Sequence, residues 1–173
     1  MGVKLHFYDL AHQTALHGYL WKQLGFKKIA SAGSDVRVSL PGSKQIEGSV
    51  CVGEAGEALN AAAKQSPKAI IVSDSRIDRK LIDTMKSRDV ILCVPFDKIL
   101  QSAGLRRSSA IYMASKLVRY AVKRGVKVSF VSFAGSEEML CSPAQLIGLA
   151  KLLGVKEEYA RKAVQETNAE LVS

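Results

Sequence analysis

Residues 69–94, AIIVSDSRIDRKLIDTMKSRDVILCV, contain a strand, a helix and a second strand in succession. The apolar run at 69–72 is uninterrupted, which is typical of a strand buried on both faces of a parallel sheet. Residues 76–87 have the spacing of a basic amphipathic helix, and residues 89–94 return to a strand. Two buried strands joined by a helix predict the repeating unit of a parallel α/β sheet.

The same alternation continues on both sides of this unit. Further strands are expected at residues 3–9, 26–31, 36–40, 49–52 and 126–133, and further helices at 11–24, 54–65, 106–123, 142–153 and 157–168, with a short helical turn up to residue 102. An open doubly wound sheet and a (β/α) barrel both satisfy this order. A full barrel usually needs about 250 residues and at least ~200, so a barrel of 173 residues would be trimmed or incomplete.

The overall composition is typical of one globular domain, expected to span residues 1–173. The hydrophobic fraction of 47% is sufficient for a buried core. No apolar run approaches the ~18 residues of a membrane-spanning helix, and the first residues lack the apolar stretch of a signal peptide. Cys51, Cys93 and Cys141 are too far apart for a zinc site or a redox pair, and a reducing compartment is expected. Cys51 and Cys93 lie within apolar runs and are expected to be buried thiols.

The net charge of the chain is concentrated in one segment. Residues 76–127 contain 13 Lys or Arg and 4 Asp or Glu, a net charge of +9, whereas the remaining residues hold 12 of each sign. Apolar runs interrupt this segment, so its charges must lie on folded elements. Such a concentration is typical of a protein that binds a polyanion, most often nucleic acid.

The longest predicted helix, residues 106–123, carries the clearest candidate binding face. Tyr112, Lys116, Arg119 and Lys123 recur at three- and four-residue steps away from the apolar stripe, giving a basic row with one aromatic side chain. A plain solvated face is the alternative interpretation. Solvated faces usually carry both signs, but no acidic residue occurs between positions 98 and 137.

Two further basic groups are candidates for contact with phosphates. Arg106 and Arg107 precede two serines at the start of the long helix, where free backbone N–H groups also favour anions. Arg79 and Lys80 lie on the helix at 76–87, diluted there by two aspartates. The complete set of candidate RNA-binding residues is Arg106, Arg107, Lys116, Arg119, Lys123, Arg124, Arg79 and Lys80.

Residues that could support catalysis are few. His6, Asp9, His12 and His17 form the one metal-type cluster, and no histidine follows them to complete a metal site or a serine triad. The loop at residues 53–56 lacks the signatures of a nucleotide-binding loop. No catalytic or metal site is therefore expected. A small barrel metallohydrolase using His6 and Asp9 stays open as the alternative, and a basic face that meets an acidic protein is a third possibility.

The C-terminal half resembles a known family. The segments are VILCVPF at 90–96, LRR at 105–107, KRG at 123–125, VSFVSFA at 128–134, CSPAQLIGLA at 141–150 and LG at 153–154. Their order and spacing resemble the protein subunit family called ribonuclease P component 3, in its archaeal and eukaryotic nuclear forms. The resemblance covers residues 89–168 well, residues 1–31 loosely and the middle poorly.

The resemblance implies a compact TIM-like (β/α) barrel akin to metal-dependent hydrolases but without their metal site. It implies a subunit of ribonuclease P, the ribonucleoprotein endonuclease that removes the 5′ leader of precursor tRNA, in which the RNA carries the catalysis. Implied partners are the ribonuclease P RNA, component 2 and other ribonuclease P proteins, with precursor tRNA met indirectly and no membrane. No cofactor is implied on this chain, magnesium is expected on the RNA, and the location is cytoplasmic, or nuclear in a eukaryote.

The family's motifs match this chain at a few positions. Arg107, with Arg106 beside it, falls at the family's arginine before the long helix. Ser132 and Ala134 fall at its Ser-Ala turn, and the Ser-Pro pair at 142–143 falls at a helix start.

The chain also departs from the family's pattern. Cys141 stands where the family often has arginine, Phe133 interrupts the Ser-Ala turn, and the middle of the chain is short. One strand–helix unit is therefore expected to be reduced.

Overall fold

The computed structural model of the chain describes residues 8–12, 23–26, 28–32, 38–39, 49–65, 67–72, 74 and 76–173. Within these ranges the strands form two parallel sheets, β1-β2 and β3-β4-β5-β6-β7. The strands are β1 (Tyr8–His12), β2 (Lys28–Ala32), β3 (Val38–Ser39), β4 (Val50–Gly53), β5 (Ala69–Val72), β6 (Ile91–Pro95) and β7 (Val128–Val131).

The order of the strands is that of a barrel. A doubly wound sheet reverses its strand order at a switch point between its two halves. Here each strand in a sheet pairs with the next one along the chain, always in parallel. The predicted α/β class with barrel-type succession is confirmed, and the open doubly wound alternative is not what the chain adopts.

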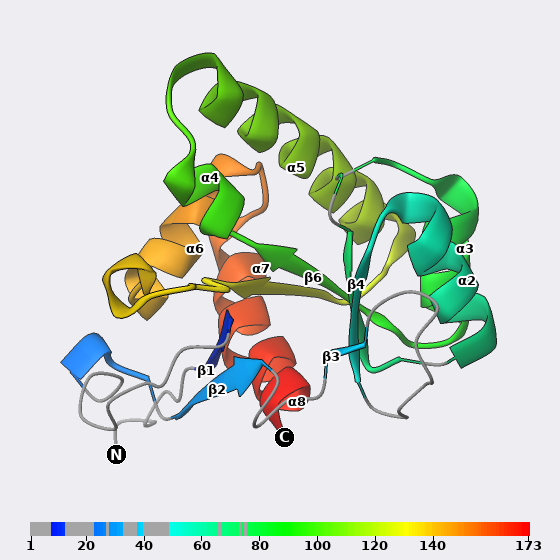
Figure 1. Cartoon of the computed structure of the whole chain (residues 1–173), viewed down its shortest axis with the longest axis horizontal. Coiled ribbons are helices and arrows are strands. Elements are labelled where there is room, and N and C mark those ends of the chain that lie inside the picture. The colour runs from blue at the N-terminus through cyan, green and yellow to red at the C-terminus, as the bar shows by residue number, and fades with distance from the viewer. Residues whose placement is uncertain are drawn as a thin grey trace.

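Helices cover the outer surface and the amino-terminal end of the strands. They are α2 (Ala55–Gln65), α3 (Arg79–Ser87), α4 (Asp97–Gln101), α5 (Gly104–Arg124), α6 (Pro143–Leu152), α7 (Glu157–Lys162) and α8 (Asn168–Val172), with the 3₁₀ turn η1 (Glu137–Met139) and the π-helical turn η2 (Ala163–Thr167). In Figure 1, α5 is the longest helix and runs across the top of the strands, from α4 towards α3. None of the helices in the described ranges combines the length and apolar character needed to cross a bilayer.

Alternate strand residues supply two separate apolar cores. Ile70 and Leu92 pack outward against the helices, whereas Ile71 and Ile91 pack into an inner cluster. The last residues of α8, 171–172, also join that inner cluster. Burial on both faces explains the continuous apolar runs of β5 and β6. All four residues of β7 are buried in the same way.

Side chains join β1 to β7 in place of a strand ladder, since no described residues of these two strands pair as neighbours. The fully buried carboxylate of Asp9 accepts hydrogen bonds from the backbone N–H of Ser132, at 2.8 Å, and from the Ser132 hydroxyl. The Nδ2 of Asn168 donates to the carbonyl of Phe130 at 2.7 Å, and its Oδ1 accepts from Ser129 at 2.7 Å. These contacts connect β1 and the C-terminal helix to β7.

The first strand differs from its prediction. It continues to His12, in parallel register with β2, so Ala11 and His12 extend the strand and do not begin a helix. Asp9 therefore lies within β1 and not at its end. Gly25, which follows the helix expected at 11–24, adopts a φ of +91°. Residues 3–7 of the expected strand and 13–22 of the expected helix lie outside the described residues.

The local signals for helix ends are confirmed. Ser142 accepts a hydrogen bond from the backbone of Gln145, whose side chain accepts in turn from the Ser142 backbone, and Pro143 occupies the first helical position. Gly125 ends α5 in the left-handed region at φ of +76°, a conformation that glycine adopts without steric cost.

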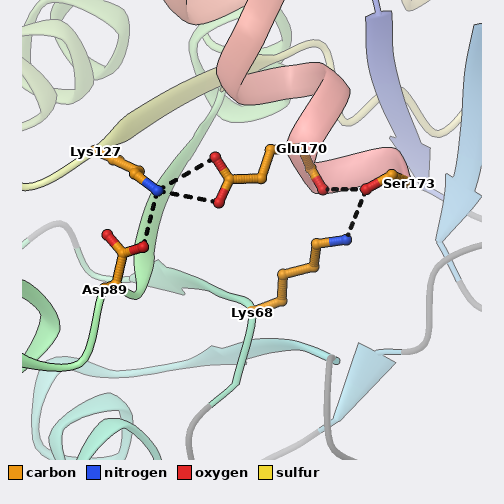
Figure 2. Close-up of polar contacts among 5 residues, drawn as sticks. All are labelled: Lys68, Asp89, Lys127, Glu170 and Ser173. Carbon is orange, nitrogen blue, oxygen red and sulfur yellow. Dashed lines mark hydrogen bonds and ion pairs between the residues drawn. The ribbon is translucent and has the colours of Figure 1, made fainter.

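The charged side chains that precede β5, β6 and β7 contact one another or α8. The Nζ of Lys127 lies 2.9 Å from Oδ2 of Asp89 and 3.1 Å from Oε1 of Glu170 (Figure 2). The Nζ of Lys68 donates to the hydroxyl of Ser173 at 3.2 Å. Together these contacts fix α8 beneath the strands, where it closes the inner cluster.

Candidate nucleic-acid interface

The outward face of α5 presents the predicted basic row. Tyr112, Lys116, Arg119 and Lys123 are all exposed. The opposite face is buried through Ala114, Leu117, Val118 and Ala121. Leu105, 89% exposed, lies on the same outward side about two turns before the tyrosine. We call these five outward residues, 105, 112, 116, 119 and 123, the α5 strip.

The cations of the α5 strip have no carboxylate partner in the part of the chain that the structure describes. The Nζ of Lys116 lies 4.4 Å from the centroid of the Tyr112 ring, a cation–π contact. The side chain of Arg119 passes close over Gly154. A Cβ added at residue 154 would lie 2.9 Å from Nε of Arg119. Unpaired charge on an ordered helix produces a positive potential directed at solvent.

The two arginines at the start of α5 have different environments. Arg107 donates from Nε to the carbonyl of Ser102 at 2.6 Å and from Nη2 to the carbonyl of Leu100 at 3.3 Å. It therefore satisfies carbonyls at the end of α4 that have no helical partner. Arg106 is exposed and makes no hydrogen bond or ion pair with described residues. The structure separates this predicted pair into one bound and one available guanidinium.

The third predicted basic group lies beside the C-terminal end of α5. Arg124 forms a two-nitrogen contact with Oδ1 of Asp83, at 2.5 and 3.0 Å, which brings α3 against α5. The hydrogen bond to Asp83 raises the pKa of Arg124 above its ordinary value. Arg79 and Lys80 remain exposed on α3. The structure thus joins α3 to α5 through Asp83, and the charge of Arg124 is matched within the chain.

Arg106 and the α5 strip extend along most of the length of one helix. Positions 106 and 123 of α5 are about 25 Å apart along the helix axis at 1.5 Å per residue. Arg106 lies at one end of this length, and Lys123 lies at the other, near α3. A surface of this length can contact several successive phosphates.

The metal-type cluster of the sequence is not assembled in the described part of the chain. No three His, Cys, Asp or Glu side chains gather there in a way that could hold a metal ion. Both carboxylate oxygens of Asp9 accept hydrogen bonds from Ser132. His6 and His17 lie outside the described residues, so their predicted proximity to Asp9 is not observed.

The three cysteines are buried, as predicted for two of them. Burial raises the pKa of the Cys93 thiol, and the nearby carboxylate of Asp9 adds to the shift. Burial also raises the pKa of Cys141 to about 11, again with a contribution from Asp9. Cys141 is therefore a neutral, buried thiol.

A small cavity lies at the carboxyl ends of β4, β5 and β6, beneath α4 and α5. Its volume is about 110 Å³. Its polar lining comes from Asp97, Lys98 and Cys93, and its remaining walls are apolar residues such as Ile71 and Phe133. Barrel enzymes bind substrates at this end of their strands, but this cavity is narrow and mostly apolar.

These features define a parallel α/β barrel-type chain with a basic outer strip and a mainly apolar cavity at its strand ends. No protein-family model matches it, and neither does any curated protein sequence. A chain in a cryo-EM structure of archaeal ribonuclease P with mature tRNA has a similar fold, with a TM-score of 0.70 and 16% identity. That alignment covers 97% of this chain and 80% of the other.

A second solved structure shares the fold at lower similarity. It is the crystal structure of A. niger ochratoxinase, with a TM-score of 0.56 and 12% identity. The alignment covers 96% of this chain but only 53% of the ochratoxinase chain. At these identities the two likenesses establish a common fold.

Proposed function

We propose that this chain is a protein subunit of ribonuclease P and supports the RNA of that enzyme without an active site of its own. The main observation behind this proposal is the similarity in fold to a chain of archaeal ribonuclease P, which covers nearly the whole length of this protein. The sequence resemblance to component 3 points to the same enzyme from different data. The α5 strip supplies a surface of the right charge.

The proposed mechanism is electrostatic. Lys116, Arg119 and Lys123 neutralise phosphates and so reduce the repulsion between neighbouring RNA helices. Arg106 adds a guanidinium at the other end of the helix, where it can contact a phosphate with two donors. The catalysis then belongs to the RNA and its magnesium ions, and component 2 is the proposed protein partner.

The test is to purify the tagged chain from its native cells and sequence the RNA that accompanies it. We expect strong enrichment of one structured RNA, with cleavage of precursor tRNA at the 5′ leader in the same fraction. A tagged variant with Lys116, Arg119 and Lys123 replaced by alanine serves as the matched control. Recovery of the chain without any enriched RNA would contradict the proposal.

The likeness to ochratoxinase favours the alternative function predicted from the sequence, a small barrel hydrolase that uses His6 and Asp9. Against it, the carboxylate of Asp9 is engaged by Ser132 across the seam between β1 and β7. This alternative requires stoichiometric metal in the purified chain and loss of a hydrolytic activity in His6→Ala. Metal-free protein that assembles with RNA would exclude it.

A further inference from the structure

Tyr112 is unusual among the aromatic side chains of this protein. Its side chain is 57% exposed, whereas Phe96 and Phe130, for example, are fully buried. The other aromatic side chains whose burial the structure describes are buried or half-buried. An exposed aromatic ring contributes nothing to the core, and exposed aromatics are enriched where a protein binds a partner. The hydrophobic core therefore gives no reason for a ring at this position.

The surroundings of Tyr112 are cationic. The ammonium of Lys116 lies over its ring, 4.4 Å from the centroid, while more than half of the side chain stays open to solvent. Arg119 and Lys123 follow on the same outward side, at about 10 and 16 Å from Tyr112 along the helix axis. Stacked nucleotides are about 3.4 Å apart, so this length corresponds to about five of them.

We infer that the α5 strip binds an unpaired segment of RNA, with one base stacked on Tyr112 and the adjoining phosphates held by Lys116, Arg119 and Lys123. This inference rests on the proposed function and names the form of RNA that the strip recognises. Every base has a π-face, so stacking on an aromatic ring is tolerant of sequence. Inside a duplex these faces are covered, whereas bases in loops, bulges and ends can stack on protein side chains.

The charge of the strip favours RNA over an acidic protein segment as the occupant. The cations line up on one helix without an acidic residue between them, which suits a continuous chain of phosphates. Carboxylates of an acidic peptide would pair with the lysines but would leave the tyrosine ring without a stacking partner. A nucleotide uses the ring and the charges together, through its base and its phosphate.

The experiment measures binding of the full chain to a short single-stranded RNA and to a long RNA duplex of mixed sequence. Tyr112→Leu, which keeps an apolar side chain but removes the ring, should weaken single-strand binding by roughly five- to a hundred-fold. Tyr112→Phe should keep it, because the ring is retained. Duplex affinity should change by less than about twofold in both variants, since phosphate contacts carry it.

The matched control is Lys123→Ala, which should weaken binding to both RNAs and lower the salt dependence. If Lys123→Ala weakens binding but Tyr112→Leu changes neither RNA, or both equally, the stacking inference is overturned while the proposed function stands. If neither wild type nor the variants bind either RNA, the stacking inference and the proposed function both fail. If polyglutamate displaces the RNA from wild type and from Tyr112→Phe but not from Tyr112→Leu, the strip would be assigned to an acidic protein instead.

Discussion

The basic residues of this protein are used in two opposite ways. At the amino-terminal ends of the strands, Lys127 contacts the carboxylates of Asp89 and Glu170, so its charge is matched within the fold (Figure 2). On α5, Lys116 and Lys123 have no carboxylate partner among the described residues. The first arrangement stabilises the chain, and the second leaves charge available to a ligand. Position in the fold, and not residue type, separates the two.

The largest effect is expected from removing the unmatched charge. Replacing Lys116, Arg119 and Lys123 with alanine should lower RNA affinity by roughly 100-fold, at about 1 kcal/mol for each charged contact. The free energy of unfolding should stay within about 0.5 kcal/mol of wild type, because these side chains are exposed. Filter binding and urea unfolding measure the two quantities. If the free energy of unfolding falls by as much as the free energy of RNA binding, these side chains stabilise the fold and the loss of affinity does not report on RNA contact.

Breaking the buried link across the β1–β7 seam should have the opposite result. In Asp9→Asn an amide group faces the N–H and hydroxyl of Ser132, so one donor loses its acceptor in the interior. We expect a loss of about 2–3 kcal/mol in the free energy of unfolding. Below the unfolding transition, RNA affinity should stay at the wild-type value. Urea unfolding with unchanged midpoint in Asp9→Asn would show that this link does not close the barrel.

The arginine pair at the start of α5 provides the same comparison within two adjacent residues. Arg107→Ala leaves the carbonyls of Ser102 and Leu100 without their donor and should cost about 1 kcal/mol of stability. Arg106→Ala should leave the melting temperature unchanged and weaken RNA binding a few-fold, by one phosphate contact. Thermal melting and RNA titration of the two single variants check this. If the two variants show the same change in melting temperature and in RNA affinity, the distinction between a bound and an available guanidinium is wrong.

The smallest effect concerns the matched charge of Lys127. Its side chain is partly exposed, so Lys127→Met should cost no more than about 1 kcal/mol and leave RNA binding unchanged. The hydrogen bond to Asp89 raises the pKa of Lys127 above its ordinary value of 10.5, with burial opposing and Glu170 assisting. The contribution to stability is therefore fully present below pH 10.5 and is lost as the pH rises through the folded-state pKa. Wild-type stability should fall over that alkaline range more than that of Lys127→Met.

Local patterns predicted much of this fold. The continuous apolar runs identified β5 and β6, and the Ser-Pro pair at 142–143 identified the start of α6, because these signals act within a few residues. The row on α5 was also predictable, since helical periodicity alone places positions 112, 116, 119 and 123 together. Even the cation–π pair follows from the four-residue spacing of Tyr112 and Lys116.

Contacts between distant residues were not predictable. Asp9 and Ser132 are separated by 123 positions, and nothing in one sequence indicates that they meet. The same holds for Asp83 with Arg124, which removes one predicted cation from the unmatched set. The predicted strand ended at residue 9, three residues before the end of β1, because an aspartate within YDLAH interrupts the apolar pattern of a buried strand. Its carboxylate is tolerated there because Ser132 supplies two donors.

The salt dependence of RNA binding tests the central claim most directly. For a single-stranded RNA, the slope of log K against log salt concentration changes by about 0.7 for each phosphate contact. Removing Lys116, Arg119 and Lys123 together should therefore flatten the slope by about 2, while Lys127→Met keeps the wild-type slope. Equal slopes for wild type and the triple variant would contradict the assignment of the RNA contact to α5.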